Sequence, residues 1–306
     1  MTRVRPPRLR PGSTVALVAP SGPVKEPLLR RGIAILESWG LTVRVGEHVL
    51  DRHPTLPYLA GLDAHRAADL QRAWCDPTVD AVLCARGGYG SMRMVDLLDW
   101  DAMAEAGPKL FTGSSDITAL HEAIGSRLNL VTLFAPIVAG EVSFDAGAQK
   151  HAWQTLFEPE SVLTLTGPAA TSLNDGVASG MIVGGNLSLL ASGVGAPDAF
   201  VPPDGSLALL EDVNEDPYRV DRMLTQLLRS GWFTGVTGVA LGSWTGCGTR
   251  DAVRDIVTDL LVGLGIPVVW ELGFGHCPDQ LTIPLGAQAT VDADQGTVTL
   301  AEPALS

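Results

Sequence analysis

Several classes of protein are disfavoured by what this sequence has little of. Lysine and arginine number only 21 against 34 aspartate and glutamate residues, which gives a formal net charge of −13. Clustered basic side chains drive binding to nucleic-acid phosphates, so this charge argues against a nucleic-acid partner. The apolar run at 15–19 is too short for the core of a signal peptide and far too short for a membrane span. We therefore expect no membrane partner.

Cysteine is scarce and widely spaced. The four cysteines are Cys75, Cys84, Cys247 and Cys277, and no two of them have the C-x-x-C spacing. This distribution favours buried free thiols over a disulfide framework or a zinc site. Free thiols persist in a reducing compartment, so we expect a cytoplasmic protein. We expect no metal and no other cofactor, because no second histidine or cysteine lies at ligand spacing from His276.

What the sequence does have is a regular alternation of short apolar runs and longer helical patterns. Hydrophobic residues make up 46% of the 306 residues, which is enough for large buried cores. In the first half the alternation is typical of a mostly parallel sheet covered on both faces, and hence of an α/β fold. Strands are expected at 15–19, 41–45, 79–85, 109–112 and 129–133, and helices at 28–39, 64–74, through Met94 and Leu98, and at 116–124.

The composition changes between Glu158 and Gly180 to proline, glycine and small polar residues. Two domains are the default expectation for a chain of this length. We therefore place an N-terminal α/β domain at 1–160, a linker at 161–178 and a C-terminal domain at 179–306. Further strands are expected at 207–210, 238–241, 268–270 and 289–292, and a helix with Asp216 at its cap and Pro217 in its first turn.

The segment Gly113-Ser114-Ser115-Asp116 joins a predicted strand to a predicted helix. In a parallel sheet such a turn lies at the carboxyl end of the strand, where ligand crevices form. A serine there presents its hydroxyl at a helix N-terminus, whose free N–H groups favour developing negative charge. This is the geometry of a nucleophile elbow, although the sequence is not G-x-S-x-G. The alternative, favoured by the capping preference of serine, is that Ser114 or Ser115 only caps the helix.

A glycine-rich turn, Arg86-Gly87-Gly88-Tyr89-Gly90, follows another predicted strand. Glycines at such a turn let backbone N–H groups approach a ligand closely, as half of an oxyanion hole or as a phosphate cradle. The dinucleotide-binding pattern fails because Arg93 stands where the third glycine belongs, and no G-K-[ST] follows. A tight turn with positive φ explains one of these glycines but not three.

A carboxylate and a histidine follow two further predicted strands. Glu211 and Asp212 end one of them, but Glu215 and Asp216 stand nearby, so spacing does not choose the working acid. His276 lies in a loop of glycine and proline, and loops on rigid scaffolds are where catalytic groups concentrate. The other five histidines lie in polar loop sequence or in helical patterns and are interpreted as bystanders; they are His48, His53, His65, His121 and His151.

Together these segments resemble the LD-carboxypeptidase family of serine peptidases, which includes the microcin-immunity peptidases. The resemblance runs through nearly the whole chain and also includes Val18-Ala19-Pro20-Ser21, Gly184-Gly185-Asn186-Leu187 and Tyr218-Arg219-Val220-Asp221-Arg222. It implies a flavodoxin-like N-terminal domain with a parallel sheet, a smaller β-rich C-terminal domain, and a homodimer.

The resemblance also implies a Ser–Glu–His triad in that chain order. By position the nucleophile corresponds to Ser115, the acid to Glu211 and the base to His276, with Glu215 as the reserve acid. The implied oxyanion donors are the backbone N–H groups of Asp116 and of the glycine turn near Gly88. Tyr89 and Asn186 are suggested as substrate contacts.

The substrate implied by the resemblance is a cytoplasmic murein tetrapeptide, which loses its terminal D-alanine during cell-wall recycling. The microcin-immunity branch instead hydrolyses a peptidyl-nucleotide antibiotic and tends to carry a longer insertion between the acid and the histidine. Here only 65 positions (276 − 211) separate the two, which favours the carboxypeptidase. A nucleotide-binding module that uses the glycine turn is the alternative from another class. A class I glutamine amidotransferase would need a cysteine where Ser114 and Ser115 stand.

Overall fold

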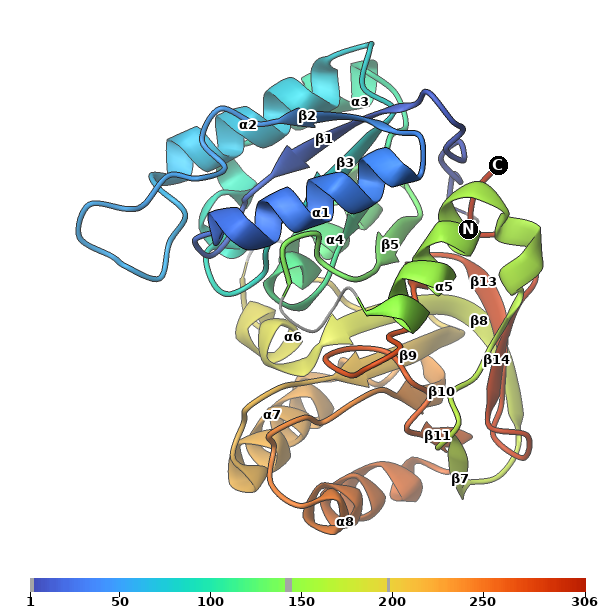
Figure 1. Ribbon diagram of the computed structural model, residues 1–306. Helices are drawn as coiled ribbons and strands as arrows, with labels where there is room; N and C mark the ends of the chain where they lie inside the picture. Colours follow the sequence, from blue (N-terminus) through green and yellow to red (C-terminus); the bar gives the residue numbers. More distant parts are fainter. Residues whose placement is uncertain (1–2, 141–144, 197–198) are drawn as a thin grey trace.

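The computed structural model describes residues 3–140, 145–196 and 199–306, and these form two β-sheets with helices packed around them (Figure 1). The first sheet has six strands, in the order β12 (Ile283–Leu285), β5 (Thr132–Phe134), β4 (Leu110–Gly113), β3 (Ala81–Cys84), β1 (Thr14–Val18) and β2 (Thr42–Val45). Strands β1 to β5 pair in parallel, whereas β12 pairs with β5 in the antiparallel sense. The five strands expected in the first half are therefore present.

The helices of this half pack against the buried strands of the first sheet. All residues of β3 and β4 are buried, as a parallel sheet with two covered faces requires. The helices are α1 (Glu26–Ser38), α2 (Asp63–Cys75), α3 (Trp100–Glu105), α4 (Thr118–Arg127) and α5 (Ala146–Phe157). Among the described residues, no helix of the molecule is both long and apolar enough to cross a membrane.

The single helix expected through Met94 and Leu98 is wrong. The chain forms two short 3-10 turns there, η1 (Ser91–Arg93) and η2 (Val95–Leu97). The next α-helix begins only where Asp99 accepts a hydrogen bond from the Ala102 N–H at 3.0 Å. Tertiary contacts that no local pattern encodes hold η1 in place, because the Ser91 backbone N–H donates to the Asp116 carboxylate at 2.8 Å.

The second sheet has eight strands. Their order is β6 (Thr164–Leu165), β14 (Thr297–Leu300), β13 (Gln288–Asp292), β8 (Val177–Asn186), β9 (Ser206–Glu211), β10 (Val236–Leu241), β11 (Val268–Trp270) and β7 (Thr171–Asn174). The four strands from β8 to β11 are parallel, and the outer strands are antiparallel. The remaining helices and turns are α6 (Leu187–Gly193), α7 (Pro217–Ser230), α8 (Arg250–Leu261), η3 (Ser115–Ile117), η4 (Pro159–Val162) and η5 (Val262–Leu264).

The segment 161–178, expected as a linker, forms strand structure at both edges of the second sheet. β6 pairs with β14 and β7 pairs with β11. The polar composition that suggested a linker is also typical of exposed edge strands. In the other direction, β12 lies within 179–306 in sequence but joins the first sheet. The domain bounds at 1–160 and 179–306 remain a prediction. The first sheet is built from strands of both ranges, because β12 pairs with β5.

The two sheets share one hydrophobic core. Buried residues of β1 and β3, such as Leu17 and Leu83, belong to the same cluster as Leu209 of β9 and Val291 of β13. Separate clusters fill the space between the second sheet and helices α6 to α8, and between the first sheet and helices α2 and α4. Figure 1 shows α2 at the top and α7 and α8 at the bottom, whereas α1 lies on the opposite side of the first sheet from α2 and contributes Leu29 and Leu36 to the shared core. The shared core fixes the position of one sheet relative to the other.

Candidate active site

Ser115 lies two residues after β4 and adopts a strained backbone conformation. Its φ is 63°, in the left-handed region that residues other than glycine seldom occupy. Such strain is concentrated at functional sites and persists only where the surroundings hold it. A sharp strand-to-helix turn with a strained serine is the geometry of a nucleophile elbow, so the turn expected from the sequence is present.

The glycine turn lies directly against Ser115. A Cβ atom added to Gly87 would lie 3.0 Å from the Ser115 Cβ and 3.4 Å from its Oγ, so the missing side chain leaves space beside the hydroxyl. Gly88 has a φ of 106°, and its N–H has no backbone hydrogen-bond partner within the described part of the chain. The N–H of Asp116 lies in the first turn of η3, where helical N–H groups lack intrahelical partners.

The side chain of Asp116 braces this turn. It is buried, and its Oδ2 accepts hydrogen bonds from the Ser21 hydroxyl at 2.5 Å and from the Ser91 backbone N–H at 2.8 Å. Ser21 follows β1 and Ser91 begins η1, so the carboxylate joins three segments that are far apart in the sequence. These bonds help to hold Ser115 in its strained conformation.

Glu211 and His276 form a close pair on the second sheet. Glu211 ends β9 with no exposed surface, and its Oε2 accepts a hydrogen bond from His276 Nδ1 at 2.7 Å and from the His276 backbone N–H at 3.3 Å. A Cβ atom on Gly275 would lie 2.5 Å from that oxygen, so glycine is required for this approach. Glu215, the reserve acid, instead forms an ion pair with Arg219.

The Glu211 carboxylate determines the protonation of His276. Burial alone would lower the pKa of His276, but the negative charge of Glu211 and its hydrogen bond outweigh burial, and the pKa is raised. The pKa of the neighbouring Asp212 is raised to about 6, first by its burial and then by the charge of Glu211. Because Nδ1–H donates to Glu211, Nε2 is left as the ring nitrogen that can accept a proton.

Ser115 and His276 line one cavity of about 870 Å³. Its lining residues are Lys25, Arg86, Gly87, Gly88, Ser114, Ser115, Ile137, Ala139, Gly140, Val213, Asn214, Thr245, His276, Cys277, Pro278 and Gln280. Arg86 makes no hydrogen bond or ion pair with the residues that the structure describes. Gln280 is 2% exposed, and its Nε2 has no hydrogen-bond partner among them. The cavity therefore offers a hydroxyl, an imidazole and unpaired donors.

The two suggested substrate contacts lie elsewhere. Asn186 is 2% exposed, and its side-chain amide donates to Glu211 at 3.1 Å and to Asp212 at 3.0 Å, so its position favours support of the acid over contact with substrate. Tyr89 is 48% exposed and packs its ring against that of Tyr58, with a centroid distance of 5.8 Å. Neither residue is among those that line the cavity.

Sequence reasoning missed Arg86 and Gln280 as cavity residues. The signal for Arg86 was its place directly before the glycine turn, where a side chain at the carboxyl end of β3 can reach the crevice. Gln280 carried no such signal, because its burial beside the cavity depends on the return of the chain towards β12.

The fold is of the α/β class, and a strained serine and a Glu–His pair with a buried glutamate lie beside one cavity. Models of the LD-carboxypeptidase N-terminal domain and C-terminal domain match residues 15–135 and 179–291. The chain therefore belongs to the LD-carboxypeptidase family, and the family resemblance expected from the sequence is confirmed. Membership makes it a hydrolase of the carboxypeptidase type.

Individual relatives agree with this assignment. A Streptomyces coelicolor protein whose name places it among the carboxypeptidases is 58% identical over 304 residues, which cover 99% of this chain and 97% of the relative. The murein tetrapeptide carboxypeptidase of Pseudomonas aeruginosa is 30% identical over 291 residues, which cover 92% of this chain and 94% of that protein.

Solved structures confirm the fold. The crystal structure of muramoyltetrapeptide carboxypeptidase from Oxalobacter formigenes superimposes with a TM-score of 0.80 at 30% identity, covering 94% of this chain and 98% of that one. The structure of MccF in complex with glutamyl sulfamoyl guanosine gives a TM-score of 0.86 at 22% identity, with 99% of each chain covered. The expected combination of a parallel-sheet N-terminal part and a sheet-rich C-terminal part is thus confirmed.

Proposed function

We propose that this protein is a serine LD-carboxypeptidase that releases the terminal D-alanine from a murein tetrapeptide. The observation that carries the proposal is the arrangement of three side chains: Ser115 and His276 line one cavity, and Glu211 accepts the Nδ1–H of His276 at 2.7 Å. The names and the identity of the relatives from Pseudomonas aeruginosa and Oxalobacter formigenes support the choice of substrate.

The proposed mechanism uses His276 as both base and acid. Its Nε2 takes the proton of the Ser115 hydroxyl as Oγ attacks the carbonyl carbon, and it then gives that proton to the nitrogen of the departing D-alanine. Water releases the acyl group from Ser115 in a second round of the same chemistry. Glu211 keeps the imidazole in the required tautomer and stabilises its protonated form. The N–H groups of Gly88 and Asp116 stabilise the oxyanion, a contribution typically worth about 10² to 10³ in rate for each donor.

Arg86 supports a carboxypeptidase over an enzyme that cuts within a chain. A carboxypeptidase has to recognise the free carboxylate beside the scissile bond, and arginine binds carboxylates through two parallel hydrogen bonds. Arg86 lines the same cavity as Ser115 and has no partner within the described residues. We assign it to the carboxylate of the terminal D-alanine. The unpaired Gln280 amide supplies a further donor in the same cavity.

Place of action and assembly follow from the same proposal. Murein tetrapeptides are recycled in the cytoplasm, so we propose that the protein acts there. The family resemblance further implies a homodimer, and sedimentation equilibrium of the purified protein measures this directly.

The test is an assay of free D-alanine released from purified murein tetrapeptide, with the corresponding pentapeptide as a second substrate. Release from the tetrapeptide alone is expected. Ser115→Ala should abolish release while the circular dichroism spectrum is unchanged, and Ser114→Ala, which alters the adjacent hydroxyl, should retain activity. D-alanine release by Ser115→Ala at a rate near that of the unsubstituted protein would refute the serine mechanism. Hydrolysis of a glutamyl sulfamoyl nucleotide in place of the tetrapeptide would move the protein to the microcin-immunity branch.

A further inference from the structure

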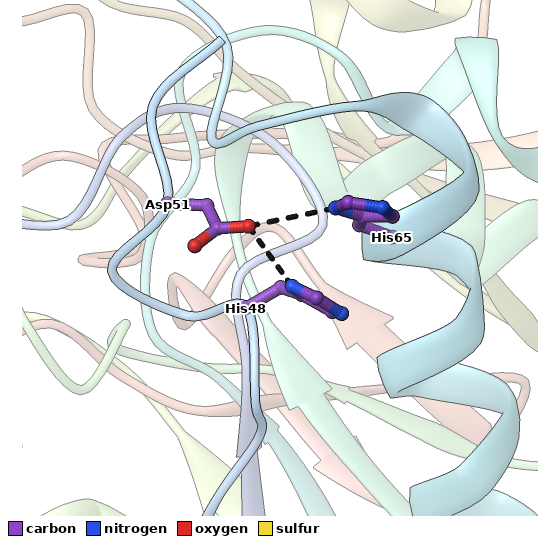
Figure 2. Close-up of side chains that lie close together, drawn as sticks. All are labelled: His48, Asp51 and His65. Atoms are coloured by element: carbon purple, nitrogen blue, oxygen red, sulfur yellow. Dashed lines mark hydrogen bonds and ion pairs between the residues drawn. The ribbon is translucent and has the colours of Figure 1, made fainter.

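Three side chains that could bind a metal ion meet outside the proposed active site (Figure 2). The Oδ2 atom of Asp51 lies 2.9 Å from Nδ1 of His48 and 3.5 Å from Nδ1 of His65. All three atoms lie within 4.8 Å of one another. His48 follows β2, whereas His65 lies in the first turns of α2, so the two ends of one surface segment bring these residues together. None of the three lines the cavity of Ser115.

We propose that His48, Asp51 and His65 bind one divalent transition-metal ion of the zinc type. Two imidazoles and a carboxylate form a ligand set that zinc accepts, with a fourth position left to water. In a tetrahedral site with ligand bonds of about 2.1 Å, neighbouring ligand atoms are about 3.4 Å apart. The two distances from Asp51 Oδ2 lie on either side of that value. The carboxylate oxygen thus lies at nearly the required spacing from both imidazole nitrogens.

Metal binding requires a small change in the two imidazoles. Their rings are stacked, with centroids 4.1 Å apart and an angle of 22° between their planes. Each ring has to turn about its χ2 angle so that both Nδ1 lone pairs point to one ion. The side chains have room for this, because His48 is 19% exposed, Asp51 41% and His65 44%. The same exposure gives the ion a path from solvent and a place for its water ligand.

The surroundings support this assignment. Metal-binding imidazoles usually have a carboxylate or carbonyl near the second ring nitrogen, which fixes the tautomer. The Oε2 atom of Glu47 lies 3.9 Å from Nε2 of His48. The backbone N–H of His48 donates to the Asp69 carboxylate at 2.7 Å, which anchors this ligand on the body of the domain. Arg72 pairs with both Glu47 and Asp69, so its positive charge is neutralised beside the site.

The metal would hold the two ends of the segment 48–65 together. Closing a long loop with a metal removes conformational freedom that the open loop would keep. Within this segment Tyr58 packs against Tyr89, which belongs to the glycine turn beside Ser115. The proposed site therefore restricts a segment that contacts the glycine turn, whose residues Gly87 and Gly88 line the cavity, although it supplies no group to the reaction.

The test is Zn²⁺ binding by the full chain after removal of metals with a chelator, measured by equilibrium dialysis with elemental analysis. We expect one ion per chain, and at least a hundredfold loss of affinity in His65→Ala and in Asp51→Asn. His53→Ala is the matched control, because His53 lies in the same segment and binds only local N–H and hydroxyl groups. Glu47→Gln should weaken binding about tenfold.

Two further measurements keep the outcome unambiguous. Zn²⁺ should raise the melting temperature of the unsubstituted chain and of His53→Ala, but not of His65→Ala, while the metal-free proteins melt alike. Co²⁺ should give the intense visible absorption of four-coordinate cobalt only where His48, Asp51 and His65 are all present. Absence of stoichiometric binding, or equal binding by His65→Ala, overturns the proposal. Ser115→Ala should bind Zn²⁺ normally, so this result is independent of the proposed peptidase activity.

Discussion

The two halves of the proposed active site are built by different means. On the first sheet, backbone geometry dominates: Ser115 has a positive φ, and glycines leave space beside its hydroxyl. On the second sheet, buried side chains dominate: Glu211 has no exposed surface and bonds both His276 and Asn186. The first half depends on the strained backbone of Ser115, which packing maintains. The second half depends on the Glu211 carboxylate, which is buried away from water. Substitutions in the two halves should therefore change catalysis and folding stability by different amounts.

The largest effect is expected from the side-chain half. Glu211→Gln removes the charge that fixes and stabilises the His276 imidazole, and kcat should fall by about 10⁴. The carboxylate also raises the pKa of His276, so the acid limb of the kcat/KM profile should move to lower pH in the variant. Steady-state kinetics across pH measure both changes.

Glu215→Gln is the matched control, because Glu215 pairs with Arg219 and does not contact His276. Its kcat should stay within about tenfold of the unsubstituted enzyme, as expected for a partly exposed ion pair outside the cavity. A larger loss in Glu215→Gln than in Glu211→Gln would reverse the assignment of the acid.

A smaller effect is expected at the cavity wall beside the serine. Arg86→Met removes the cation assigned to the terminal carboxylate, and kcat/KM should fall by about 10², mainly through a higher KM. Arg93→Met is the control, since Arg93 pairs with Asp63 and does not line the cavity. If KM for the tetrapeptide is unchanged in Arg86→Met, another group binds the carboxylate.

The smallest effect is one of stability and concerns the packing behind the serine turn. His121 is buried, its Nε2–H donates to the Gly113 carbonyl at 2.9 Å, and burial lowers its pKa to about 4. The unfolded chain takes up this proton below about pH 6.5, whereas the folded chain does so only near pH 4. Folding stability should therefore fall as the pH drops through this window, by about 3 kcal/mol from this residue.

His121→Gln tests this by urea unfolding at several pH values. Glutamine can still donate to the Gly113 carbonyl but does not titrate, so the difference in stability between the two proteins should change with pH over that window. His151, whose pKa burial also lowers to about 4, is present in both proteins and cancels in the comparison. A constant difference between pH 4 and 7 would show that His121 does not titrate in this way.

The parallel strands could be predicted because a sheet covered on both faces needs unbroken apolar runs, and β3 and β4 are such runs. β12 could not be predicted, because it is three residues long, contains Pro284 and pairs with the distant β5. The turns η1 and η2 were also missed, since their geometry depends on the contact of Ser91 with Asp116.

The site was predictable to a similar degree. The strand-end positions of Ser115 and His276, together with the family resemblance, indicated both residues. Glu211 and Glu215 could not be separated by spacing, because the choice depends on which carboxylate meets the imidazole once β9 and the following loop are folded. The cluster of His48, Asp51 and His65 matches no short motif, because its members come from different elements.

The placement of β12 has a consequence for motion. The loop that carries His276 leaves β11 in the second sheet and enters β12 in the first, so each end is tied to a different layer. Any hinge motion that separated the two layers would strain this connection, which spans residues 271–282. Under the proposed mechanism, rearrangement of surface loops would admit substrate while leaving the connection intact, and His276 would stay beside the cavity that it shares with Ser115.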